Sequence, residues 1–375
     1  MSKPRILHIL RGNALMVDRS LSGRLSRYEG VRPSFMLYDI EDVGASENLS
    51  FNEEWIDKLP RGMFKGVLRR SHPLANKSGY FCALCRLFCI EFRMVDFLKI
   101  LFGPRNLVFH SVYLKPASII LLKFFFKNVT IIHWGGARTE PCTRQERINE
   151  YCLSFVDRIL VLMSPELKYF SYLKRVRDRV QVLSYYDERF FNRMIDDDEL
   201  SDSDSRCLLV GNSGWSLTEY ESFLSNFNWD GWEKVVCMLS YGPTEHRDRF
   251  VSKWSLLQPE KFVPWLENLP YVEYKRRMSE VQYYVCPKAT QTGLGAIYHS
   301  VLQKKTLFLT GDNYEWLNDL GMRTIRIEDV NDFSYENVRR LRNTEAESLR
   351  NVKLLKDMFL SRYTAEVWYR TILGK

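Results

Sequence analysis

The sequence lacks the features that mark an exported or membrane-spanning protein. The apolar run at residues 6–10 is cut off by Arg11 before it reaches the roughly seven residues that a signal peptide needs. Charged residues likewise interrupt residues 81–102 and 117–126, so neither segment supplies the roughly 18 apolar residues of a spanning helix. Eight cysteines among 375 residues are too few for a disulfide scaffold. We therefore expect a cytoplasmic chain with reduced thiols.

Signatures of several common ligand sites are also missing or badly placed. There is no Walker loop, no dinucleotide fingerprint and no motif of a DNA- or RNA-binding module, so nucleic acid is not an expected partner. The Asp-x-Asp patterns at 196–198 and 202–204 lie in an acidic segment with no flanking strand to fix their geometry. Cys82, Cys85 and Cys89 share one helix face without a second pair at zinc spacing, which favours core packing. We expect no metal and no cofactor.

The composition is nevertheless that of a globular protein. A hydrophobic content of 45% with 14% aromatic residues can fill large cores, and 375 residues suffice for two mid-sized domains. The formal charge of +8 is unevenly distributed: residues 1–186 hold 29 basic and 17 acidic side chains, whereas residues 187–375 hold 25 and 29. The basic excess therefore belongs to the first half.

Within that half, residues 58–127 form a basic stretch rich in phenylalanine. It holds 13 Lys and Arg residues against only Glu91 and Asp96. Cations interleaved with aromatic rings suit an anionic lipid surface or a ligand that carries a diphosphate. The alternative is an ordinary solvated basic face over core aromatics.

Short β-rich runs alternate with helical segments along the chain, as in doubly wound parallel sheets. In the first half the predicted strands are residues 5–10, 106–110, 129–133, 158–163 and 179–184. The predicted helices there are residues 78–101, 116–126, 143–155 and 165–176. In the second half we predict strands at 207–210, 234–239, 281–286, 306–309 and 324–327, with helices at 216–227 and 296–303. The fold class is therefore α/β, with two Rossmann-like domains.

The domain boundaries follow from charge and composition. We expect an N-terminal Rossmann-like domain over residues 1–186 and an acidic linker over 187–205. A second Rossmann-like domain would cover 206–333. Residues 334–375 show helical apolar spacing without strand signals, and these C-terminal helices could pack back on the first domain.

Three small-residue turns follow predicted strands of the second half and would meet at one edge of its sheet. Glycine lets a ligand approach the backbone, and the N–H groups at a helix start attract anions. Open α/β sheets bind ligands at this edge. A plain strand-to-helix connection is the alternative for each turn. The candidate residues for a bound nucleotide diphosphate are Gly211, Asn212, Ser213, Gly214, Tyr241, Gly242, Lys288, Thr290, Gln291, Thr292, Gly293 and Gly295.

Candidate catalytic residues lie after strands of the first half. His110 and His133 each end a predicted strand, where an imidazole can act as a general base near neutral pH. Asp18, in the loop after the first strand, is a competing carboxylate base, and Glu140 is a further acidic candidate. The alternative for each histidine is that it merely caps a strand end.

These pieces together resemble a known family. The matching segments are residues 209–214, Tyr-Gly-Pro at 241–243, Gln291 with the glycines at 293 and 295, Phe-His at 109–110, and Trp-Gly at 134–135. In their order and spacing the chain resembles the bacterial 4-acetamido-4,6-dideoxygalactose (Fuc4NAc) transferases, most strongly over about 206–320. It departs from them at Thr290, where an arginine is expected beside the glutamine, and Lys288 stands two residues earlier.

The resemblance implies a glycosyltransferase-B (GT-B) fold, in which two facing Rossmann-like domains bind the donor in the C-terminal and the acceptor mainly in the N-terminal one. It implies a dTDP-linked amino sugar as donor and a polyprenyl-diphosphate-linked glycan as acceptor. The candidate residues of the second half would then surround the donor. Stretch 58–127 would meet the membrane and the acceptor's diphosphate.

We therefore predict a metal-independent glycosyltransferase of bacterial surface polysaccharide synthesis, peripheral on the inner face of the plasma membrane. The nucleotide sugar would be a substrate, and a lipid-linked glycan and the anionic membrane would be its partners. One alternative is a GT-B transferase that uses a UDP- or GDP-sugar on another acceptor. The other is a noncatalytic protein that binds nucleotide or nucleic acid.

Overall fold

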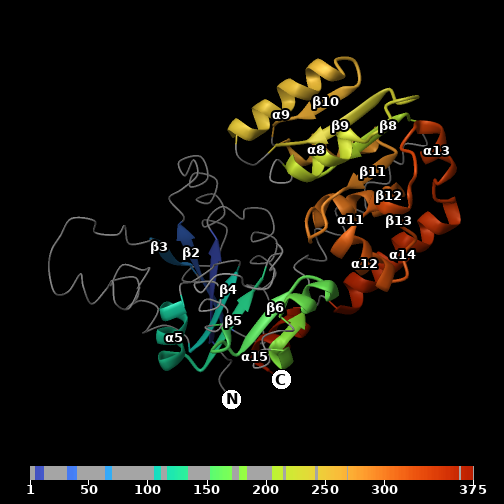
Figure 1. Ribbon diagram of the computed structural model, residues 1–375. Helices are drawn as coiled ribbons and strands as arrows, with labels where there is room; N and C mark the ends of the chain where they lie inside the picture. The colour runs from blue at the N-terminus through green and yellow to red at the C-terminus, as the bar shows by residue number, and fades with distance from the viewer. Residues whose placement is uncertain are drawn as a thin grey trace. The chain divides into compact units, whose positions relative to one another are not determined.

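The computed structural model (Figure 1) describes residues 5–11, 32–39, 64–69, 105–110, 116–133, 153–170, 177–183, 205–213, 217–240, 244–267, 269–362 and 365–374. The chain divides into two compact units. Unit 1 comprises Met1–Phe190 together with Leu360–Lys375, and unit 2 comprises Phe191–Phe359. Unit 1 is therefore built from both ends of the chain.

Unit 1 contains a parallel sheet with the order β3-β2-β1-β4-β5-β6-β7. Its strands are β1 (Arg5–Arg11), β2 (Arg32–Asp39), β3 (Phe64–Arg69), β4 (Asn106–His110), β5 (Asn128–Ile132), β6 (Arg158–Val161) and β7 (Val180–Val182). The described helices are α5 (Pro116–Phe125), the 3-10 turns η1 (Ser164–Phe170) and η2 (Arg177–Arg179), and α15 (Ala365–Leu373). Because the strand order reverses beside β1, the sheet is doubly wound.

Unit 2 repeats this architecture with the order β10-β9-β8-β11-β12-β13. Its strands are β8 (Cys207–Val210), β9 (Lys234–Met238), β10 (Phe262–Trp265), β11 (Tyr283–Cys286), β12 (Thr306–Leu309) and β13 (Ile325–Arg326). Its helices are α8 (Leu217–Ser225), α9 (Thr244–Leu257), α10 (Tyr271–Ser279), α11 (Leu294–Leu302), α12 (Gly311–Asp319), η4 (Ile327–Asp329), α13 (Tyr335–Arg340) and α14 (Glu345–Arg362). The predicted α/β class with two Rossmann-like sheets is confirmed.

The strands that sequence patterns miss contain residues that strands usually avoid. β2 has Pro33 near its start, β3 has a glycine at its centre, and β10 contains Pro264. β10 lies at the end of its sheet, where a residue without an N–H is tolerated. Of the predicted helices, 78–101 and nearly all of 143–155 lie outside the described residues, while 165–176 begins as the 3-10 turn η1.

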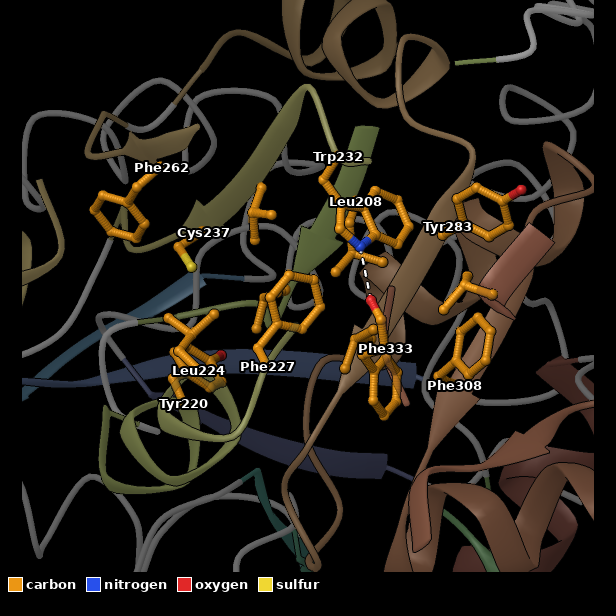
Figure 2. Packing of buried hydrophobic residues seen from close by; sticks show 14 of the residues in the cluster. Leu208, Tyr220, Leu224, Phe227, Trp232, Cys237, Phe262, Tyr283, Phe308 and Phe333 are labelled. Atoms are coloured by element: carbon orange, nitrogen blue, oxygen red, sulfur yellow. Dashed lines mark hydrogen bonds between the residues drawn. The ribbon is translucent and has the colours of Figure 1, made fainter. Parts of the chain in front are cut away.

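An aromatic cluster forms the centre of unit 2 (Figure 2). The Trp232 side chain is buried, and its indole N–H donates to the carbonyl oxygen of Phe333 at 2.7 Å. The Trp232 ring also contacts Tyr283 of β11 and Tyr335 of α13 edge-on. The segment after β13 is thereby held against the turn before β9, so α13 belongs to the body of this unit.

The C-terminal helices are divided between the units. α13 and most of α14 belong to unit 2, whereas α15 packs on unit 1. The Trp368 ring of α15 stacks on His110, with ring centroids 5.9 Å apart. Arg158, at the start of β6, donates to the carbonyl oxygen of Ile372 at 2.7 Å. None of the helices in the described part of the chain is long and apolar enough to cross a membrane.

Beneath α15, two buried histidines share a hydrogen bond. His8 of β1 and His110 of β4 are fully buried, and Nδ1 of His8 lies 3.0 Å from Nε2 of His110. Tyr369 contacts the His8 ring edge-on. Burial lowers the pKa of His8 to about 3, and burial followed by the charge of His8 lowers the pKa of His110. Both rings are therefore neutral at pH 7, and one N–H serves the pair.

This pair predicts a loss of stability at acid pH. An unfolded histidine takes up a proton below about pH 6.5, whereas the buried ring resists it, so stability falls as the pH drops from about 6.5 toward 3. At pH 5.5 the penalty is about 1.4 kcal/mol per histidine. The double variant His8→Asn/His110→Gln, which cannot titrate, should show a flatter profile of urea midpoint against pH. Parallel profiles for variant and wild type would contradict this account.

Candidate functional site

The candidate site lies at the carboxyl edge of the sheet in unit 2. β8 and β11 are neighbouring parallel strands, and Val285 pairs with Val210 near their ends. The chain segments that follow them begin side by side, at the edge where open α/β sheets bind ligands. We call residues 211–213 the β8 loop and residues 287–293 the β11 loop.

The N–H groups of the β8 loop are used inside the protein. Gly211 N–H donates to the carbonyl oxygen of Val285 at 2.8 Å. The N–H groups of Asn212 and Ser213 both donate to the phenol oxygen of Tyr220, at 2.8 and 3.3 Å. These three amides therefore have acceptors inside the protein, from β11 for Gly211 and from α8 for Asn212 and Ser213.

The Tyr220 phenol is fully buried, which matches this role. Burial, followed by the nearby Cys286 thiol, raises the pKa of the phenol above its ordinary value. The group therefore stays protonated and accepts hydrogen bonds without becoming an anion. Sequence patterns did not reveal Tyr220, because a tyrosine on an amphipathic helix is indistinguishable from a core residue.

Polar side chains join the two loops. The side-chain amide of Asn212 and the hydroxyl of Thr292 exchange hydrogen bonds at 3.2 and 3.3 Å. On the other side, the side-chain amide of Asn313 donates to the carbonyl oxygen of Thr292 at 3.1 Å. The structure thus brings together Asn212 and Thr292, two residues that the sequence analysis singled out separately.

The β11 loop ends in a helix start suited to an anion. Gly293 caps α11 in the left-handed conformation, with φ of +65°. The next N–H groups, from residues 294–296, have no acceptor within the helix, and the first turn of α11 carries no acidic side chain. Gly295 lies in this turn and is partly exposed. The amides of residues 294–296 are thus left available to an anionic ligand at this edge of the sheet.

Lys288 supplies a cation in the same loop. It is partly buried, and its Nζ lies 4.0 Å from the Glu219 carboxylate of α8. Thr290 and Gln291 follow it and are also partly exposed. The backbone N–H of Gln291 donates to the carboxylate of buried Asp312 at 3.3 Å. Asp312 was missed by the sequence analysis, although its place three residues after the end of the predicted strand 306–309 is a usable signal.

Unit 1 pairs the candidate base His133 with a carboxylate. Nδ1 of His133, which directly follows β5, lies 3.5 Å from Oε1 of Glu166 in η1. The other oxygen of Glu166 accepts the N–H groups of Leu162 and Met163, at 2.8 and 3.1 Å. His133 and Glu166 are both buried. Glu166 was missed, and the available signal is an acidic residue shortly after a predicted strand.

The other candidates are placed differently. His110 ends β4 as predicted, but it lies under α15, where its contacts are those of a packed core residue. Asp18, Gly214, Tyr241 and Gly242 lie outside the described residues. The acidic patterns at 196–198 and 202–204 also lie outside them. Within the described ranges, no group of three or more His, Cys, Asp or Glu side chains could hold a metal ion.

The comparisons with known proteins concern the fold. No protein-family model matches the chain, and no curated protein matches it. Among solved structures, the N-terminal domain of Candida albicans trehalose-6-phosphate phosphatase matches with a TM-score of 0.63 and 14% identity, covering 100% of this chain and 97% of that one. A glycosyltransferase from Rickettsia africae matches with a TM-score of 0.60 and 10% identity, covering 100% of both chains.

An Arabidopsis thaliana UGT complexed with UDP-L-rhamnose also matches, with a TM-score of 0.57 and 14% identity, covering 100% of this chain and 99% of that one. Structural similarity at such low sequence identity establishes the architecture and leaves the substrate open. Together with the two doubly wound sheets, this similarity shows that the chain has the GT-B fold.

The close contact between the loops predicts that Gly293 cannot be replaced. A Cβ at Gly293 would lie 2.9 Å from Cγ of Asn212, in addition to the left-handed strain of about 1–2 kcal/mol. Gly321 is the matched control, because it has φ of +78° but its nearest neighbours would be 3.9 Å away. Gly293→Ala should lower the melting temperature more than Gly321→Ala. Equal decreases in melting temperature for the two variants would contradict a close contact between the loops at Gly293.

Proposed function

We propose that this protein is a glycosyltransferase that moves a sugar from a nucleotide diphosphate to a lipid-linked glycan. The observation that carries the proposal is the start of α11, where unpaired helix amides, the partly exposed Thr292 and Lys288 gather at the carboxyl edge of the sheet. A diphosphate fits this combination of helix amides, hydroxyls and one cation. The GT-B fold supports the same reading.

Two observations bear on the identity of the donor, and they favour different nucleotides. The resemblance to Fuc4NAc transferases favours a dTDP-linked deoxy-amino sugar. The similar Arabidopsis thaliana structure holds UDP-L-rhamnose, which favours a UDP-sugar. We propose the dTDP-sugar as donor and treat the UDP-sugar as the outcome that would replace it.

The chemistry follows from where negative charge develops. A hydroxyl of the acceptor attacks the anomeric carbon of the donor, the bond from this carbon to the diphosphate oxygen breaks, and the nucleoside diphosphate leaves. Lys288 and the first amides of α11 stabilise the leaving charge, so we propose that no metal ion is needed. For the base we retain His133 of unit 1 as a candidate, because the Glu166 carboxylate near its Nδ1 would stabilise the imidazolium that forms when the ring takes up a proton. Asp18 remains the competing base.

A surface of unit 1 supports peripheral membrane binding. Phe124 and Phe125, at the end of α5, are 81% and 51% exposed. Arg105 and Lys127 are exposed nearby, and the backbone N–H of Lys127 donates to the carbonyl oxygen of Arg105 at 2.9 Å. Exposed phenylalanines beside cations suit the interface of an anionic bilayer. We therefore propose that this part of stretch 58–127 contacts the inner face of the plasma membrane.

A nucleotide screen tests the donor site. A ligand at 100 times its Kd adds about 2.7 kcal/mol. This raises the melting temperature of a domain of this size by about 5–10 °C. We expect dTDP and its sugars to produce this shift in the presence of EDTA. Lys288→Ala should weaken binding by about tenfold or more, since hydrogen bonds to charged groups contribute about 1.5–3 kcal/mol.

Lys304→Ala is the matched control, because Lys304 has similar exposure and lies 3.9 Å from a carboxylate of Glu345. It should bind nucleotide as the wild type does. A shift with UDP-sugars alone would replace the donor. No shift with any nucleotide diphosphate, together with salt-dependent oligonucleotide binding, would overturn the proposal.

A vesicle sedimentation assay tests the membrane surface. Binding to vesicles of anionic phospholipid should be strong at low salt and weaker at high salt. Phe124→Ser/Phe125→Ser should reduce it by about tenfold or more, because each buried phenylalanine contributes about 1.5–3 kcal/mol. Leu256→Ser removes a side chain of unit 2 that is 82% exposed and should have no effect. Absence of binding by the wild type at low salt would contradict this proposal.

A further inference from the structure

The β8 loop sits at the proposed donor site, yet its N–H groups are already bonded. Gly211 donates to β11, and Asn212 and Ser213 donate to one buried phenol. A phosphate that approached this loop would have to displace Tyr220 from a fully buried position. The loop therefore serves the site by some means other than donating its own amides.

We propose that Tyr220 is a positioning residue of the donor site. Its phenol oxygen fixes the β8 loop, Asn212 of that loop fixes Thr292, and Thr292 sets the first turn of α11, whose amides receive the diphosphate. This inference depends on the proposed function only for the identity of the ligand. The mechanical linkage from Tyr220 to α11 stands on the hydrogen bonds of the protein itself.

At two glycines the backbone lies in close contact with side chains of the linkage. A Cβ on Gly211 would lie 1.9 Å from the phenol oxygen of Tyr220, so the loop backbone rests directly against the ring. A Cβ on Gly293 would lie 2.9 Å from Cγ of Asn212 and 3.1 Å from the phenol oxygen of Tyr284. Because the Asn212 side chain lies directly against the backbone at residue 293, a displacement of Asn212 must move that residue, where α11 begins.

The opposite side of the β11 loop is held separately by α12. Asn313 donates to the carbonyl oxygen of Thr292, and Asp312 accepts the N–H of Gln291. The backbone N–H of Asp312 donates in turn to the carbonyl oxygen of Ala289 at 2.9 Å. Loss of the Tyr220 phenol therefore frees the Asn212 side of the β11 loop from its anchor, while α12 still holds the other side. α11 stays folded, and its first turn loses its fixed orientation.

The competing explanation is that Tyr220 is only a core side chain. It belongs to the aromatic cluster, and Figure 2 shows it beside Leu224 of the same helix. In that case Tyr220→Phe, which keeps the ring, would leave α11 unaffected. Tyr283→Phe is the matched control, since Tyr283 is equally buried in the same cluster but begins β11 at the opposite edge of the sheet.

Amide hydrogen exchange of the ligand-free protein tests the linkage without reference to any substrate. The readout is the first hydrogen-bonded amides of α11, at residues 297–299, beginning with Ile297, whose N–H donates to the carbonyl oxygen of Gly293 at 2.9 Å. Tyr220→Phe should increase exchange at residues 212–213 and at 297–299, whereas Tyr283→Phe should increase neither. Thr292→Val, which breaks the linkage further along, should increase exchange at 297–299 and leave 212–213 protected. An increase at 212–213 alone in Tyr220→Phe would overturn the proposal. Thr292→Val provides the test if Tyr220→Phe does not fold, and unchanged exchange at 297–299 in it would then overturn the proposal.

Donor kinetics provide the second readout. Tyr220→Phe should raise the donor KM by about tenfold, as expected from about 1.4 kcal/mol of lost positioning, with kcat changed by less than about twofold. A donor KM equal to that of the wild type would overturn the positioning role. If the wild type binds no nucleotide but exchange at 297–299 responds as expected, the proposed function fails and the linkage stands.

Discussion

The pairing of β8 with β11 is the constraint on which the candidate site depends. These strands run parallel, and Val285 is opposite Val210 where both strands end. The β8 and β11 loops therefore leave the sheet next to each other, although about 80 residues separate them along the chain. Every contact between Asn212, Thr292 and Gly293 is a consequence of this register. A slip of one residue would turn Asn212 away from the β11 loop.

The two sides of this site use polar groups in opposite ways. On the β8 side the backbone donors are consumed by Val285 and Tyr220, which makes the loop rigid. On the β11 side the helix start keeps its donors, and Gly293 permits the sharp entry into α11. The hydrogen bonds that hold the site together thus lie in a different loop from the amides proposed to bind the ligand, so the proposed binding would not disturb those hydrogen bonds.

Sequence patterns predicted the features that depend on neighbouring residues in the chain. They missed the features that depend on residues far away in the sequence. β4, β8 and β12 were predicted to the residue, because each is a short apolar run bounded by polar residues. β10 was missed because its Pro264 counts against a strand in sequence patterns, although a strand at the edge of a sheet tolerates proline. Asn212 and Thr292 were found from the turns that contain them. The acceptor of the Asn212 and Ser213 amides, Tyr220, was not predicted, because it is a buried helix residue that no sequence pattern distinguishes.

The discontinuity of unit 1 bears on the order in which the protein folds during synthesis. Unit 2 is complete once Phe359 has left the ribosome, whereas unit 1 still awaits α15. Until Trp368 and Tyr369 arrive, His110 and His8 have no aromatic cover from that helix. The half of the chain that is translated first is thus the half that is finished last, and its core stays open to chaperones and proteases until α15 has been synthesised.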